Sequence, residues 1–269
     1  MTELQSQEAT AIVALTRWAR PMNEELMALA PLLGETAYDL RLRMAGPAPV
    51  LVGQRLSLDQ ARDLLQVLLG RGHGAVAFEA KKVLDRAQIQ RPRRIGIDGD
   101  ILSLRTPDER RALDLKQIFC LLLAVHRSHE ESSETIKQKK FSAGRAVMTG
   151  GLIRNKKKKV TITQSEDHRE RVLYLFRRDG LQTIALHESL LIMEAEAEAI
   201  EATRNSNFTA LLERIRQAAP HANYDERLSL PRKLDEIDLP AFMRSSTNAL
   251  DVLAHCLVIA YAQNQIDPA

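Results

Sequence analysis

The chain has 269 residues, of which 45% are hydrophobic and 27% charged, as expected for a folded protein with a substantial core. Aromatic residues make up only 4%, so the sequence is poorly supplied with stacking platforms for bases or sugars. The N-terminus lacks the apolar core of a secretory signal, and Ala249–Ala262 is too short to span a bilayer. Cys120 and Cys256 both lie in apolar runs, which predicts buried, reduced thiols and a cytoplasmic location.

The net charge of +3 conceals a strong asymmetry along the chain. Residues 92–180 hold 20 Lys and Arg against 12 Asp and Glu, whereas residues 181–269 hold 7 against 13. The middle of the chain is therefore basic and its last third acidic. Such a charge distribution bears on partners and solubility rather than on fold.

The N-terminal third predicts helices followed by a small mixed module. The spacing of Ile12, Leu15 and Trp18 predicts a helix, and Pro21 begins a second helix that ends at Gly34. In Tyr38–Met44 apolar and charged residues alternate, which predicts a half-buried strand. Ser57 and Gln60 form a capping box before a leucine-rich helix, and Ala75–Glu79 follows as a strand. These elements together predict a β-α-β module.

The polar segment Arg91–Arg94 is the predicted boundary of this module. Beyond it, Arg94–Arg105 predicts a hairpin with its turn at Asp98-Gly99. Thr106 and Glu109 flank Pro107 as in a capping box, which predicts a helix start. The run Ile118–Val125 is continuously apolar and therefore buried, and its periodicity is compatible with either a strand or a helix.

The rest of the chain predicts short strands and then helices. Asp179-Gly180 supplies the turn between two of the strands. The predicted strands are Val160–Thr163, Val172–Arg177 and Thr183–His187, and the predicted helices are Glu188–Glu201, Asn207–Ala219 and Thr247–Ala262.

The predicted fold class is α+β, a small β-α-β module followed by an antiparallel β-rich module with a closing helix and a helical C-terminal tail. The predicted domains are residues 1–91 (helical N-terminus and β-α-β module), 92–219 (β-rich module with a basic loop) and 220–269 (helical acidic tail).

The order of elements in residues 93–219 resembles that of a pleckstrin-homology-like barrel. The hairpin Arg94–Arg105, the strands near Val160, Val172 and Thr183, and the helix Asn207–Ala219 follow one another in that order. The helix predicted at Glu188–Glu201 departs from this pattern. The resemblance implies a module that binds acidic lipids or peptides.

Three polar clusters are candidates for metal binding or catalysis, and each has a simpler structural explanation. His126 and His129, followed by Glu130 and Glu131, mark the end of the apolar run rather than a metal site. His168 lacks an orienting partner, and Tyr224–Leu228 is better explained as an Asp–Arg anchor of the tail. No GxSxG, HExxH, GxGxxG or CxxC pattern occurs. The sequence therefore predicts no catalytic residue, no metal and no cofactor.

The segment that stands out is Lys137–Lys159, which carries nine cations and no acid in 23 residues. Two interpretations stay open, a mobile solubilising loop and a surface that binds anions. The cations are Lys137, Lys139, Lys140, Arg145, Arg154, Lys156, Lys157, Lys158 and Lys159.

The sequence favours a non-catalytic regulatory or protein-interaction protein with an anion-binding basic loop. The alternative is a weak, non-specific nucleic-acid-associated protein, and an anionic membrane surface is a further possible target of the same loop. A third class, an enzyme whose site is assembled from distant residues, is less favoured.

Overall fold

The computed structural model confirms the α+β class, and its described residues form five α-helices and three small sheets. It describes residues 10–80, 83, 89–105, 110–141, 155–180, 183–193, 204–232 and 246–267, with the backbone alone for 127–141, 155–168, 193, 204 and 246–248. The chain divides into two compact units, one formed by residues 1–126 and 170–269 and the other by residues 127–169.

The N-terminal part of the larger unit is a three-stranded antiparallel sheet of order β2-β1-β3 with three helices. Its elements are β1 (Ala11–Arg17), α1 (Met22–Leu33), α2 (Ala37–Arg43), β2 (Val50–Leu56), α3 (Leu58–Gly70) and β3 (Gly74–Glu79).

The helix predicted around Ile12 and Leu15 is wrong, because Ala11–Arg17 forms the central strand of this sheet. Val13 and Leu15 face the N-terminal core, where they pack with α1, α2 and α3. Ile12 and Ala14 face the opposite side and belong to a central core that includes α7 (Ser246–Ala262). A strand buried on both faces is apolar throughout, so it shows no alternation in the sequence.

The strand predicted at Tyr38–Met44 is also wrong, since Ala37–Arg43 is helix α2. The Thr36 hydroxyl caps it by accepting a hydrogen bond from the Asp39 N–H at 3.1 Å. Leu40 and Met44, one helical turn apart, are fully buried in the N-terminal core. Burial of two residues one turn apart agrees with a helix. The alternation of apolar and charged residues in Tyr38–Met44 did not distinguish a helix from a strand.

Helix α3 confirms the predicted capping box. The Ser57 hydroxyl accepts from the Gln60 N–H at 3.2 Å, and the Gln60 side chain accepts from the Ser57 N–H at 2.9 Å. Ala61, Leu64 and Leu68 are the buried residues of this helix.

Two four-stranded sheets follow, of order β10-β4-β5-β6 and β11-β7-β8-β9, and strands β7 and β8 continue into the smaller unit. Their elements are β4 (Arg94–Asp98), β5 (Ile101–Arg105), β6 (Arg110–Asp114), β7 (Ile118–Phe141), β8 (Asn155–Arg177), β9 (Ile184–His187), β10 (Ile192–Met193) and β11 (Asn223–Asp225). The short 3-10 helices are η1 (Leu115–Gln117) and η2 (Arg227–Ser229).

The hairpin at Arg94–Arg105 is confirmed, with Gly99 in its turn at a φ of +55°. The helix expected after Thr106–Glu109 is not found, because Arg110–Asp114 continues the sheet as β6. The capping residues themselves lie outside the described residues. Main-chain bonds also tie Arg93 to Arg105 and to Ile192, so the segment before β4 belongs to the sheet.

The apolar run Ile118–Val125 is strand, the first part of β7. Cys120 and Leu122 face the central core, while Leu121 and Leu123 face a second core, the β-rich core, closed by helix α6 (Arg204–Ala218). Burial on both faces explains the continuous apolar run. Successive residues of strand β8 likewise face the central core and the β-rich core in turn.

The helix predicted at Glu188–Glu201 is wrong over its first residues. Glu188–Leu190 is a turn, and Ile192–Met193 pairs in parallel with β4 as β10, while residues 194–201 lie outside the described residues. The next helix is confirmed as α6, which buries Phe208, Leu211 and Ile215 in the β-rich core. No closed barrel forms among the described strands.

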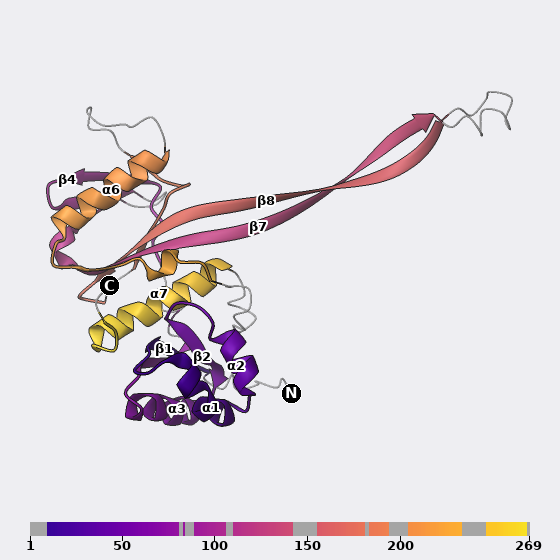
Figure 1. The fold of residues 1–269 in the computed structure, drawn as a ribbon. Coiled ribbons are helices and arrows are strands. Elements are labelled where there is room, and N and C mark those ends of the chain that lie inside the picture. Colours follow the sequence, from indigo (N-terminus) through magenta and orange to yellow (C-terminus); the bar gives the residue numbers. More distant parts are fainter. Residues whose placement is uncertain are drawn as a thin grey trace, which may run out of the picture. The chain divides into compact units, whose positions relative to one another are not determined.

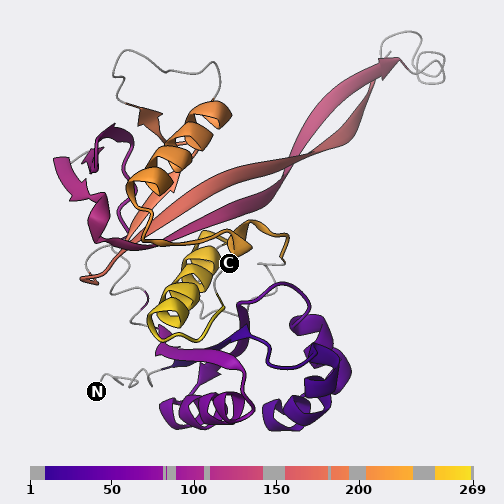
Figure 2. The same ribbon diagram turned by 60° about the vertical axis from the view of Figure 1, so that its left-hand side comes forward.

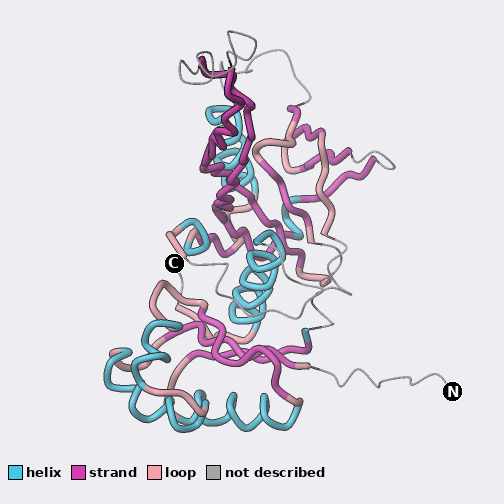
Figure 3. The backbone as a smooth tube through the Cα atoms, turned by 90° about the vertical axis from the view of Figure 1, so that its right-hand side faces the viewer, coloured by secondary structure: helices cyan, strands magenta, loops and turns pink. Residues whose placement is uncertain are grey.

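Helix α7 occupies the centre of the larger unit. In Figures 1 and 2 it lies between the β1–β3 sheet and the sheet that contains β7 and β8. Figure 3 shows the N-terminal sheet with its own helices on one face and α7 on the other. Val252, Cys256 and Leu257 are fully buried in the central core. The segment expected to be an acidic tail thus supplies a core helix.

Candidate functional site

Most of the predicted anion-binding residues lie in the smaller unit, on two neighbouring strands. Lys137, Lys139 and Lys140 are in β7, and Lys156–Lys159 is in β8. Arg145 and Arg154 lie outside the described residues. The expectation of a loop is therefore corrected at both ends of the basic segment, because residues 137–141 and 155–159 are strand.

Figures 1 and 2 show the two strands of this unit side by side as a twisted ribbon. Residues 127–141 and 155–169 are strand throughout, and at about 3.3 Å per residue each stretch extends about 50 Å. Their sequences are polar, with Ile136, Phe141, Val160 and Ile162 as the apolar residues. A two-stranded ribbon of this composition has little apolar surface with which to form a core of its own.

Among the predicted histidine candidates, the side chain of His126 is described and is partly buried. The side chains of His129, Glu130 and His168 lie outside those described. Among the side chains that the structure does describe, no three His, Cys, Asp or Glu residues gather as a metal site would require.

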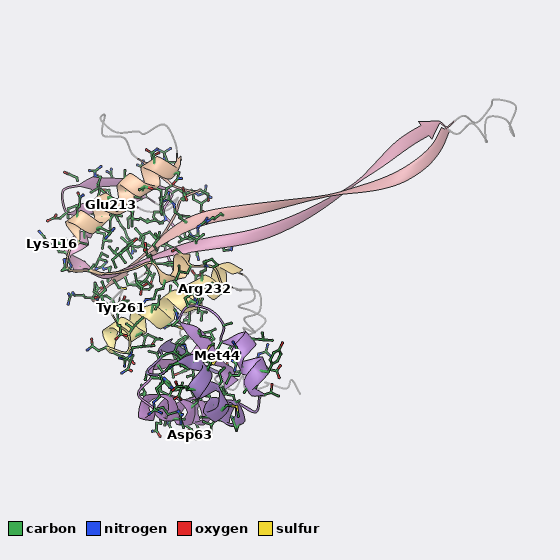
Figure 4. The ribbon with its side chains drawn as sticks, viewed as in Figure 1. Met44, Asp63, Lys116, Glu213, Arg232 and Tyr261 are labelled. Carbon is green, nitrogen blue, oxygen red and sulfur yellow. The ribbon has the colours of Figure 1, made fainter. Side chains whose placement is uncertain are left out.

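The segment Tyr224–Leu228 anchors the C-terminal part of the chain. Asp225 is almost fully buried, accepts a hydrogen bond from the Tyr261 hydroxyl at 2.9 Å and lies 3.3 Å from Nε of Arg227. Arg232 donates to the main-chain oxygens of Arg227 and Pro49, at 2.9 and 3.2 Å. Burial lowers the pKa of Arg232 to about 10. Figure 4 shows Tyr261 and Arg232 within the larger unit.

A second buried carboxylate, Glu25, is enclosed by the N-terminal module. It lies 2.6 Å from Nε of Arg71 and 3.2 Å from Nε2 of His73. The other ring nitrogen of His73 accepts from the Ala19 N–H at 3.1 Å, so Nε2 carries the hydrogen and donates to Glu25. The hydrogen bond from Arg71 is the main cause that lowers the pKa of Glu25. All of these groups are engaged with one another, which is typical of a structural network.

The larger unit contains a cavity of about 560 Å³ that the sequence did not predict. It lies against one face of α7, beside Phe119 of β7, the end of β8 and Asn223 of β11. Arg177 and Arg178 line it together with aromatic and aliphatic side chains, among them Phe176 and Ile259. These residues come from four separate parts of the chain, so no local sequence pattern could reveal them.

No known protein family matches the chain, and no curated protein or solved structure matches it either. The described helices include none that is long and apolar enough to cross a membrane.

Proposed function

We propose that the chain is a non-catalytic interaction protein that binds an anionic partner through the basic segment Lys137–Lys159. The observation that carries the proposal is the concentration of nine cations, without an acid, within 23 residues. Seven of these cations belong to two neighbouring strands. Like charges held this close repel one another, and an anionic partner relieves that repulsion.

A non-catalytic role is supported by three carboxylates of the larger unit. Glu25, Asp225 and Asp251 are each engaged by cations or hydroxyl groups of the protein's own fold. Carboxylates tied in this way stabilise a structure, whereas a general base needs a free lone pair directed at a substrate.

Nucleic acid is the second candidate partner, and the ribbon favours it. The major groove of B-DNA, about 12 Å wide, admits a two-stranded β-ribbon, and lysines then contact phosphates. Because aromatic residues make up only 4% of the chain, we expect such binding to show little preference for a particular nucleotide sequence.

The test replaces Lys156, Lys157, Lys158 and Lys159 together by Gln. Binding is measured by fluorescence anisotropy with duplex DNA, single-stranded RNA and polyglutamate, and by co-sedimentation with phosphatidylserine vesicles. Counterion release makes phosphate binding steeply dependent on salt, and loss of four contacts lowers the slope of log K against log salt by roughly 3 to 4.

The matched control removes the same charge elsewhere, by changing four exposed arginines of the larger unit to Gln. If the control weakens binding as much as the lysine variant does, net charge rather than the segment is responsible. Absence of binding to every probe at low salt contradicts the proposal. A preference for polyglutamate or for nucleic acid identifies the class of partner. The control residues are Arg41, Arg62, Arg94 and Arg110.

A further inference from the structure

The cavity beside α7 has the size and the walls of a small-molecule site. Its volume of about 560 Å³ falls within the range of roughly 300 to 1,000 Å³ that is usual for ligand pockets. It lies entirely within the larger unit, and none of the residues described along it belongs to the basic segment.

One face of α7 forms an apolar wall of this cavity. Ile259 and Ala262 are about one turn apart on the same side of the helix, and Val258 and Ala262 are likewise one turn apart. Ile259 is only partly buried although it packs against the central core, and the same holds for Phe119. Apolar surface therefore remains available to a ligand.

The end of β8 adds positive charge to this apolar wall. Arg177 and Arg178 both line the cavity, and no acidic residue is found among the described residues that line it. Arg178 is exposed, and its side chain forms no ion pair with the part of the chain that the structure describes. Arg177 binds Gln117 and Asp179 through Nη2, while its buried Nε has no hydrogen-bond partner among the described groups.

The geometry points to this cavity as a binding site for a small amphiphilic anion, a molecule with an apolar, ring-bearing body and one carboxylate. The body packs between the α7 face and the rings of Phe119 and Phe176. The carboxylate meets the exposed guanidinium of Arg178 in a charge-assisted hydrogen bond, and the neighbouring Arg177 adds positive charge to the same wall. This site is independent of the proposed function, because it shares no residue with Lys137–Lys159.

Two probes of the same shape test the proposal by calorimetric titration of the full chain. They are 6-phenylhexanoate and its neutral counterpart 6-phenylhexan-1-ol. We expect saturable binding of both, with the anion bound about tenfold more tightly because it forms the charge-assisted contact. Arg178→Gln removes most of that difference and leaves binding of the alcohol unchanged. Arg110→Gln, an exposed arginine away from the cavity, changes neither.

Filling the cavity separates a true pocket from binding elsewhere. Ile259→Trp abolishes binding of both probes, with folding checked by thermal melting. Since Ile259 contributes to the core, Ala262→Phe serves as a second filling variant at an exposed position. The inference is overturned if the intact chain binds neither probe, if acid and alcohol bind equally, or if folded Ala262→Phe binds both with unchanged affinity. The Gln variant of Lys156–Lys159 should bind both probes with normal affinity. Failure of the proposed function can therefore be distinguished from failure of this inference.

Discussion

Tyr174 in strand β8 donates its phenolic hydrogen to Oδ1 of Asp251 in helix α7 across 2.7 Å. The other carboxylate oxygen, Oδ2, accepts from Nη2 of Arg91 at 3.0 Å. Burial raises the pKa of the Asp251 carboxyl, and the bonds from Tyr174 and Arg91 act against that rise. One carboxylate thus joins the central helix to the sheet and to the segment before β4.

The first prediction concerns this hydrogen bond. Tyr174→Phe keeps the ring but leaves the buried Asp251 without one of its donors, so we expect a loss of about 1.5 to 3 kcal/mol in the free energy of unfolding. Urea denaturation measures it. The exposed Tyr38 provides the control, and Tyr38→Phe should shift the same quantity by less than about 0.5 kcal/mol. Equal effects at the two positions would show that the bond does not stabilise the fold.

The second prediction concerns the close approach of the chain's C-terminal end to β3. A methyl group on Gly74 would overlap the carbonyl oxygen of Gln265 and lie 2.9 Å from Cβ of Arg17. Gly74→Ala should therefore destabilise the protein by about 1 to 3 kcal/mol, as other overpacked sites do. Gly70, at the end of α3, has open space around it. Gly70→Ala should be neutral or stabilise by up to about 1 kcal/mol. Thermal melting of both variants tests the packing.

The third prediction is a pH dependence from Glu25. Glu25→Leu leaves the buried Nε2–H of His73 without an acceptor, which should cost about 1 to 3 kcal/mol at pH 7. The lowered pKa of Glu25 means that its contribution is complete above the ordinary value of 4.5 and is lost as the pH falls through the folded-state value. The difference between the variant and the wild type should therefore shrink in acid. Unfolding curves at pH 7 and in acid measure it, and a difference that grows in acid would refute the assignment.

The fourth prediction concerns the thiols. Cys120 and Cys256 are fully buried and unpaired, and desolvation raises the pKa of both thiols. We expect a thiol reagent such as 5,5′-dithiobis(2-nitrobenzoic acid) to label neither in the native protein, and to label both at once in denaturant. Rapid labelling of either thiol without denaturant would mean that the central core opens readily.

Elements with strong local signals could be predicted from the sequence. The reciprocal bonds of Ser57 and Gln60 start α3 using side chains three residues apart, and the Asp98-Gly99 turn needs only the backbone freedom of glycine. The buried helix α7 was also predicted, although its place at the centre of the fold was not. Local hydrogen bonding and backbone sterics determine such features, so a few neighbouring residues are enough.

The two candidate sites also differ in whether the sequence could reveal them. The charge of Lys137–Lys159 is a property of composition, and the sequence alone reveals it. The cavity is different, since Phe119, Arg178 and Ile259 meet only after β7, β8 and α7 have packed. A site assembled from residues far apart in the chain leaves no spacing in the sequence to recognise.

The sequence by itself determined the α+β class, the capped helix α3, the hairpin and the basic segment, because each rests on local chemistry or on charge. Only the tertiary structure decided that Ala11–Arg17 is a strand and Ala37–Arg43 a helix. Ile12 and Val13 face different cores, so burial on both sides removed the alternation that identifies a strand. Leu40 and Met44 bury together against α1 and the sheet, and that packing outweighed an alternating local pattern.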